Sequence, residues 1–224
     1  MTRTLYTILI GFAILSLTGC GGGIPPTSST TTSILSAPAL DGDIWKTSPN
    51  SFTITQGMSS SVQSVVAGVD PVGRTEYRAF LAFPLGGNAG IPFNAFIDSA
   101  FLNIHIKSIQ PNPGTIPILI ELVSFEPPTL RATDYDRSLL PPLAFTRILP
   151  PISSVDVGSN ISIDVTSLMV EAQFKGLSYF QVRILEDFGT SPGLIEINNT
   201  TGINRPASCW KSCTTSSSRE TLFS

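Results

Sequence analysis

The sequence predicts an all-β domain, an antiparallel β-sandwich with one short helix. Short stretches rich in Ile, Leu, Val and Phe recur along residues 40–206, and several alternate with polar residues as half-buried strands do. Turn-forming clusters separate these stretches, such as Gly-Gly-Asn at 86–88 and Pro-Asn-Pro-Gly at 111–114. Long helical periodicity is absent from the sequence. Short strands and turns at this spacing are typical of a sandwich.

The clearest strand covers residues 100–106. Leu102, Ile104 and Ile106 alternate there with Phe101, Asn103 and His105, and we expect the aliphatic set to face the core. The other strands are predicted at 51–55, 78–83, 116–123, 161–165, 179–185 and 194–197.

One helix of one or two turns is predicted at 166–174. Leu168, Met169 and Ala172 would cover an open end of the sandwich, and Thr166 would cap the first turn by accepting from its free N–H groups. Asp164, just before it, is interpreted as a turn-organising residue. Residues 125–152 are rich in proline and are predicted to form a long surface loop.

The first 19 residues are predicted to be an export signal. Arg3 provides a positive start, and the apolar run at 5–17 is shorter than the roughly 20 residues that cross a bilayer as a helix. Leu17-Thr18-Gly19-Cys20 then resembles the lipobox of bacterial lipoproteins, in which the cysteine is joined to diacylglycerol and the chain is cut before it. The resemblance implies lipid attachment at Cys20. The alternatives are an ordinary signal peptide, or an uncleaved anchor, with a chance cysteine.

Residues 20–39 are predicted to be a flexible tether after the lipidated cysteine, because Gly, Pro, Ser and Thr dominate there and cannot bury a core. Gly21 is not the aspartate that retains some lipoproteins at the inner membrane. The expected location is therefore the cell envelope, facing the periplasm or the exterior, and the outer membrane if the cell has one.

Charge and cysteine content restrict the partners. The net charge is −3, and loss of Arg3 with the signal leaves 12 basic against 16 acidic residues, or −4, which argues against nucleic acid. Cys209 and Cys213 are either free or paired with each other. They lack partners for a metal, since His105 is the only histidine. We expect no cofactor and no metal.

No catalytic constellation is evident in the sequence. His105 lies within a predicted strand and is interpreted as a sheet-face residue rather than a triad base. Asp134 and Asp136 lie on the predicted loop, where they are interpreted as solvated acids; the alternatives are a catalytic pair or calcium ligands.

Two arginines and five aromatic residues complete the candidates for ligand contact. Arg78 and Arg183 lie in apolar strands and are interpreted as ion-paired at the sandwich edge, with ligand contact as the alternative. The aromatic residues that could stack on a sugar are Trp45, Tyr77, Tyr135, Tyr179 and Trp210.

Several segments together resemble DNRLRE-type domains of secreted bacterial and archaeal proteins. The segments are Asp41-Gly42, residues 77–85, Ile91-Pro92, residues 95–104, residues 163–166 and Asn204-Arg205-Pro206. The resemblance implies a jelly-roll-like, carbohydrate-binding-like sandwich that is mostly non-catalytic, with polysaccharide as a partner in some members.

The sequence departs from that family after Pro206. Residues 207–224 lose alternation and become rich in Ser, Thr and Cys, and are predicted to be an irregular tail. A frameshift or truncation near Ala207 and a natural flexible tail are both open.

These observations predict a membrane-anchored, non-catalytic binding or structural module that contacts polysaccharide. The alternatives are a hydrolase of envelope polysaccharide and a truncated gene product without activity.

Overall fold

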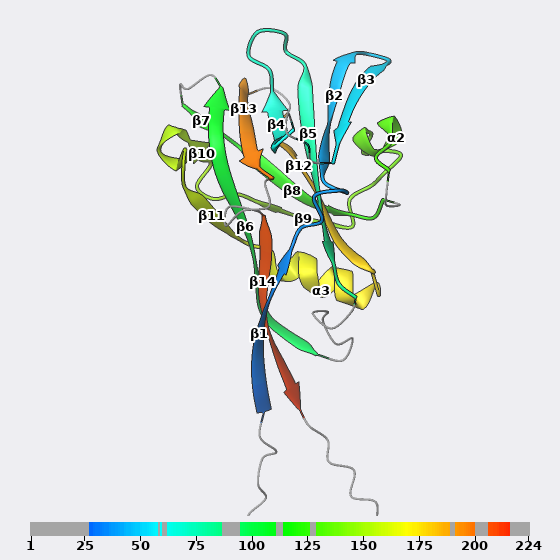
Figure 1. Cartoon of the computed structure of the whole chain (residues 1–224), viewed down its shortest axis with the longest axis vertical. Helices are drawn as coiled ribbons and strands as arrows, with labels where there is room; N and C mark the ends of the chain where they lie inside the picture. The colour runs from blue at the N-terminus through cyan, green and yellow to red at the C-terminus, as the bar shows by residue number, and fades with distance from the viewer. Residues whose placement is uncertain are drawn as a thin grey trace, which may run out of the picture. The chain divides into compact units, whose positions relative to one another are not determined.

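Antiparallel strands make up most of the computed structural model, which confirms the predicted all-β, sandwich-like fold (Figure 1). The structure describes residues 27–57, 59, 62–86, 95–110, 114–125, 129–188, 191–199 and 206–215. Apart from Thr27, Ser28 and Thr215, these residues belong to one compact unit, Ser29–Thr214. The predicted signal, Cys20, and the segments Ile91-Pro92 and Asn204-Arg205 lie outside the described residues.

One large sheet bends around the core and is nearly closed. Its main path runs in the order β1 (Thr27–Leu35), β14 (Ala207–Thr215), β6 (Phe96–Gln110), β13 (Gly193–Asn198), β4 (Ser64–Val69), β5 (Glu76–Pro84), β12 (Tyr179–Glu186), β8 (Ile118–Val123) and β9 (Ala144–Arg147). Three strands branch from it: β11 (Asn160–Asp164) on β6, β2 (Gly42–Ser48) on β5, and β3 (Ser51–Gln56) on β2. A separate two-stranded sheet joins β7 (Thr115–Ile116) to β10 (Ile152–Ser153).

Strand β6 links the two sides of the sandwich. Its first part pairs with β11 and β14, and its last residues pair with β13. The predicted alternation is confirmed, because Leu102, Ile104 and Ile106 are buried. All seven predicted strands are present, but Pro117 divides the predicted 116–123 strand into β7 and β8, since proline cannot donate to a ladder.

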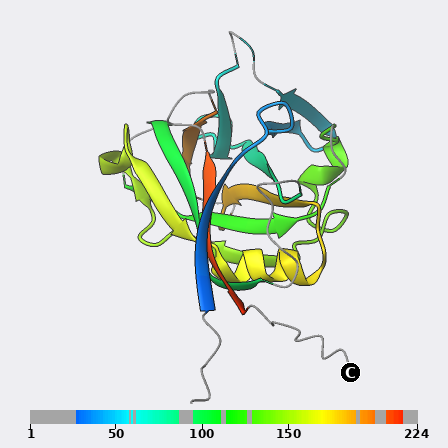
Figure 2. The ribbon, with the colours of Figure 1, turned by 60° about the horizontal axis from the view of Figure 1, so that its bottom comes forward.

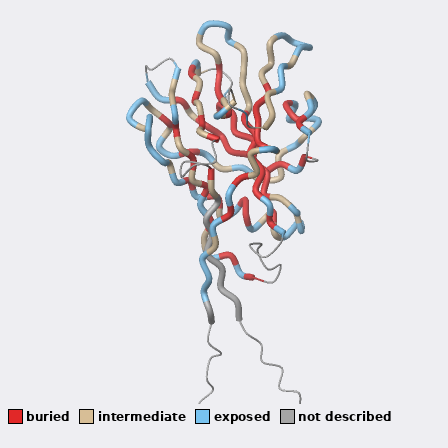
Figure 3. Tube along the Cα trace, viewed as in Figure 1, coloured by how far each residue is buried: buried red, intermediate tan, exposed pale blue. Residues whose placement is uncertain are grey.

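The main core lies inside the bent sheet, where Figure 3 shows the buried residues gathered. Helix α3 (Thr166–Phe174) has the predicted bounds and contacts β6, β8, β9 and β12. Leu168, Met169 and Ala172 are fully buried against the core, as predicted.

The outer face of β5, β8 and β12 carries a second, smaller core. Ile44, Phe80 and Val123 pack there with Leu130 and Tyr135, which come from the segment after β8. The expectation that residues 125–152 form a plain surface loop was therefore wrong. The segment contains the short helix α2 (Ala132–Tyr135) and β9, because it covers apolar side chains that the sheet presents outward.

The ends of the domain also differ from expectation. β1 lies within the predicted tether and β14 within the predicted irregular tail, and the two strands are neighbours in the sheet. Ile34 is buried, and the Ser36 N–H donates to the Pro206 carbonyl at 3.1 Å. Strand pairing uses the backbone N–H and C=O groups, and Ser and Thr residues carry these just as aliphatic residues do.

The start of α3 differs in one detail. Val165 is the N-cap residue and makes no side-chain cap bond, so the prediction that Thr166 caps the helix was wrong. The Asp164 carboxylate organises the turn instead, accepting from the Thr166 N–H at 2.9 Å and its hydroxyl at 2.6 Å. The Thr166 hydroxyl in turn accepts from the Ala100 N–H at 3.0 Å, which joins α3 to β6.

Candidate functional site

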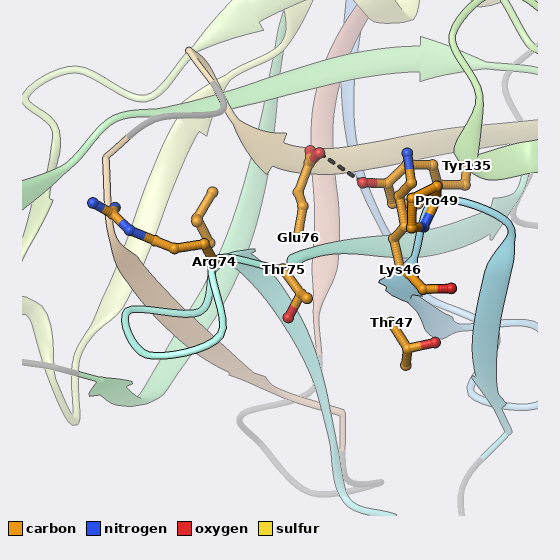
Figure 4. Close-up of a pocket in the computed structure, with 9 residues that line it drawn as sticks. Lys46, Thr47, Pro49, Arg74, Thr75, Glu76 and Tyr135 are labelled. Carbon is orange, nitrogen blue, oxygen red and sulfur yellow. Dashed lines mark hydrogen bonds between the residues drawn. The ribbon is translucent and has the colours of Figure 1, made fainter.

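A groove of about 440 Å³ lies between the β2–β3 hairpin and the β4–β5 turn (Figure 4). Its lining is mostly polar and carries two cations, one carboxylate, three side-chain hydroxyls of Ser and Thr, and one aromatic ring. Arg74 extends away from the Tyr135 ring (Figure 4). The lining residues are Lys46, Thr47, Ser48, Pro49, Val69, Arg74, Thr75, Glu76 and Tyr135.

The β4–β5 turn positions one side of the groove. The Asp70 carbonyl accepts from the Arg74 N–H at 2.9 Å, and the Thr75 carbonyl accepts from the Asp70 N–H at 2.8 Å. Arg74 has a φ of 56°, a backbone region that a residue other than glycine rarely adopts. The turn therefore holds the exposed Arg74 at the rim while β5 carries Glu76 into the groove (Figure 4).

Tyr135 connects the groove to the second core. Its hydroxyl donates to Glu76 Oε2 at 2.7 Å, and the Arg78 guanidinium stacks over its ring at 4.0 Å. Arg78 also forms a forked pair with Glu76, Nε to Oε1 at 2.8 Å and Nη2 to Oε2 at 3.0 Å, and donates to the Tyr135 carbonyl. Arg78 is thus ion-paired, as predicted, although it lies on β5, which has neighbours on both sides, rather than at an edge.

Burial, and secondarily the Glu76 carboxylate, raise the pKa of Tyr135 above the ordinary range of a phenol. Tyr135 is therefore a neutral hydroxyl at physiological pH and cannot serve as a general base. Lys46 Nζ, from β2, lies 5.7 Å from the centre of the same ring.

A stacked aromatic pair lies on the other face of the β2–β5 ladder from Lys46 and Glu76. The rings of Trp45 and Tyr77 lie parallel, 5.2 Å apart with 4° between their planes. Trp45 Nε1 donates to Thr75 Oγ1 at 2.8 Å, which joins the pair to the groove wall. Tyr77 also borders a second depression of about 290 Å³ beside Glu196.

The carboxylate of Glu196 is already occupied by protein donors. It accepts from Lys107 Nζ at 2.7 Å, from Ser108 Oγ at 2.7 Å and from the Ser64 hydroxyl. Burial opposes ionisation here, but these hydrogen bonds outweigh it and lower the pKa of Glu196. Glu196 is therefore a structural anion that ties β13 to β4 and β6.

Arg183 is ion-paired, but not at an edge as predicted. It lies fully buried in β12, between β5 and β8. Its Nε and Nη2 contact Glu121 Oε2 at 2.8 and 2.6 Å, and Nη1 donates to the Asp134 carbonyl at 2.8 Å. Because Nη2 also donates to the Leu140 carbonyl at 3.0 Å, Arg183 fastens the α2 segment to the sheet.

The two candidate loop acids do not converge. Asp134 is buried, which corrects the interpretation that it is solvated, and its Oδ2 accepts from the Arg131 N–H at 2.8 Å at the start of α2. Asp136 is exposed, and hydrogen bonds from the Ser138 hydroxyl and N–H lower its pKa. Across the described residues no group of three or more His, Cys, Asp or Glu is placed to hold a metal ion.

The remaining candidate residues either make structural contacts or have side chains outside the described set. His105 lies on the outer face of β6 and contacts Asn160 Oδ1 through Nδ1 at 3.1 Å. Tyr179 is half-buried against the second core. The backbones of Cys209, Trp210 and Cys213 lie in β14, and their side chains are outside the described set.

Sequence reasoning missed Lys46, Arg74, Thr75 and Glu76. They are single polar residues in separate strands and turns, and only the turn residues at 70–74 gave a local signal.

Comparison with models of known protein families and with curated protein sequences finds no match. Within the ranges that the structure describes, no helix is long and apolar enough to cross a membrane.

Proposed function

We propose that this chain is a lipoprotein of the cell envelope, anchored through Cys20, whose β-sandwich is a non-catalytic module that contacts polysaccharide. The anchoring is supported by Leu17-Thr18-Gly19-Cys20 after an apolar run of signal-peptide length. The resemblance to DNRLRE-type domains supports the polysaccharide partner.

The groove of Figure 4 carries the binding role. Sugars present many hydroxyls and apolar C–H faces, and they are recognised by convergent polar groups beside aromatic rings. Lys46 and Arg74 offer charged hydrogen-bonding groups, and Thr75 offers a hydroxyl. Tyr135 supplies the aromatic ring of the lining.

The geometry favours binding over hydrolysis. Glycoside hydrolysis uses an acid with a raised pKa and a second carboxylate across a cleft. Asp134 is engaged in capping α2, and the pKa of Asp136 is lowered. In the groove, Glu76 is the one carboxylate of the lining and is held by Arg78 and Tyr135.

Anchoring is tested by producing the full chain in a bacterial host. We expect the N-terminal peptide to begin at Cys20 with attached acyl chains by mass spectrometry, and the Cys20→Ser variant to leave the membrane fraction. An unmodified Cys20 would exclude the lipoprotein proposal.

Binding is tested on an array of bacterial polysaccharides, with release of reducing sugar measured in parallel. The double variant Lys46→Ala with Arg74→Ala should weaken retention roughly tenfold or more, since each charged hydrogen bond contributes about 1.5–3 kcal/mol. Lys175→Ala on α3 is the matched control and should bind as the unaltered protein does. Sugar release that depends on Asp134 or Asp136 would favour the hydrolase, and equal binding by both variants would remove the groove from the proposal.

A further inference from the structure

We propose that the end of the sandwich formed by the last turn of α3 and the first residues of β6 lies against the lipid bilayer. This inference rests on the proposed anchoring at Cys20. It adds an orientation, in which one end of the domain faces lipid and the groove faces away from it.

Large apolar side chains are exposed at this end. Phe174 is 83% exposed, Phe96 71% and Val170 44%. Val170 and Phe174 line one shallow depression with Lys175 on α3. Gln173 Nε2 donates to the Ala95 carbonyl at 2.8 Å, which places the start of β6 against the last turn of the helix. Clustered exposed phenylalanines on a soluble domain mark a surface that meets another apolar phase.

The path of the chain leads to the same end. β14 runs antiparallel to β6, from Ala207 opposite Asn103 to Cys213 opposite Phe96. β1 neighbours β14, and Ser36, just after β1, bonds to Pro206, just before β14. The part of β1 near Ser29 therefore lies beside the part of β14 near Cys213, which pairs with Phe96. In Figures 1 and 2, β1 and β14 run past α3 toward the lower part of the view.

The length of chain before β1 limits the distance to the anchor. Six residues separate Cys20 from Thr27. Fully extended, the seven residue steps from Cys20 to Thr27 span at most about 25 Å. Since residues 27–35 are a strand rather than slack chain, the anchor holds this end close to the lipid surface.

The groove lies at the other end of the sandwich. The Leu85 N–H, just after β5, donates to the Ser178 carbonyl just after α3, at 2.9 Å. The last residues of β5 thus lie near α3, and its first residue, Glu76, lies a nine-residue strand away, roughly 30 Å. A bilayer under α3 would leave the groove open to ligands outside.

The charge of this end favours apolar contact over attraction to anionic lipid. Lys175 pairs with Glu171 at 3.3 Å, and Asp98 is exposed on β6 two residues after Phe96, so the described side chains of this end carry no excess of basic charge. Transfer of an exposed phenylalanine side chain from water to an apolar phase is favourable whatever the headgroup charge. The expected occupant is therefore the surface of a bilayer irrespective of headgroup charge.

The test places a tryptophan at each end of the lipid-carrying protein, purified from membranes and reconstituted into phosphatidylcholine vesicles. Phe174→Trp reports on the proposed lipid face. Val72→Trp, in the β4–β5 turn at the opposite end and 90% exposed, is the matched control. Quenching by brominated phosphatidylcholine is measured relative to the unaltered protein, which contains Trp45 and Trp210.

We expect the added tryptophan at 174 to lose about half of its emission or more and the one at 72 to be unaffected, with the same result when anionic lipid is included. Equal quenching at both positions, or none at 174 in protein that remains vesicle-bound, would overturn the orientation while leaving the anchor intact. Protein that lacks the acyl modification and does not sediment with vesicles would overturn the anchoring and, with it, the orientation.

Discussion

Arg183→Met tests the inference that one buried arginine fastens the α2 segment to the sheet. Methionine retains much of the apolar stem but removes every donor. The change leaves the fully buried Glu121 with one cation, Arg137. Arg137 Nη2 lies 2.6 Å from Glu121 Oε1, an ion pair without the alignment of a hydrogen bond. It also removes donors to the carbonyls of Asp134 and Leu140.

The expected loss is about 3–5 kcal/mol in the free energy of unfolding, the range for removing one member of a buried pair. A typical domain has about 5–15 kcal/mol in total, so the variant should unfold at much lower denaturant. Urea titration followed by circular dichroism measures the change. The double variant Arg183→Met with Glu121→Leu should recover at least half of the loss, because it removes the stranded charge.

A loss below about 1 kcal/mol in the single variant would contradict the fastening role. A double variant as unstable as the sum of its single variants would show that Glu121 and Arg183 are not coupled.

Three further predictions concern the core, a close backbone contact and pH. Leu168→Ala should cost about 2–5 kcal/mol by opening a cavity under α3, whereas the half-exposed Val170→Ala should cost less than about 1 kcal/mol in the same urea titration. Gly68→Ala should lower the thermal midpoint, because the added Cβ would lie 2.2 Å from the Gly193 carbonyl oxygen at a φ of 120°; an unchanged midpoint would contradict that contact. Burial raises the pKa of Asp43 to about 6 against hydrogen bonds from Val66 and Thr55, so the folded state binds the proton more tightly than the unfolded state does. The stability that neutral Asp43 contributes is present below about pH 4 and is lost as pH rises to about 6. Relative to the Asp43→Asn variant, the free energy of unfolding should fall by about 3 kcal/mol over this range. A difference between the two proteins that is constant from about pH 4 to 7 would refute this.

Local pattern was sufficient for the elements that bury one face. The alternation at 100–106 and the bounds of Thr166–Phe174 are both present in the structure, because their apolar spacing leaves only one face to bury. The same reasoning failed for β1 and β14. Their residues are rich in Ser and Thr, and what orders them is pairing with a strand distant in sequence.

The candidate groove could not be read from the sequence. Lys46 comes from β2, Arg74 and Thr75 from the β4–β5 turn, and Tyr135 from α2, and each is unremarkable in its own segment. Tyr135 was singled out only as an aromatic residue, and its contacts with Glu76 and Arg78 come from the folding of α2 over the sheet.

The sequence by itself determined the fold class, the strands with an apolar face, the helix, and the expectation of an anchor at Cys20, because each depends on spacing or on a contiguous motif. Tertiary structure decided the pairing of the terminal strands, the second core and the groove. It also decided that Arg183 lies buried rather than at an edge. Burial of a charge depends on what covers the strand, and that cover comes from residues 129–143, about 40 to 54 positions earlier in the chain.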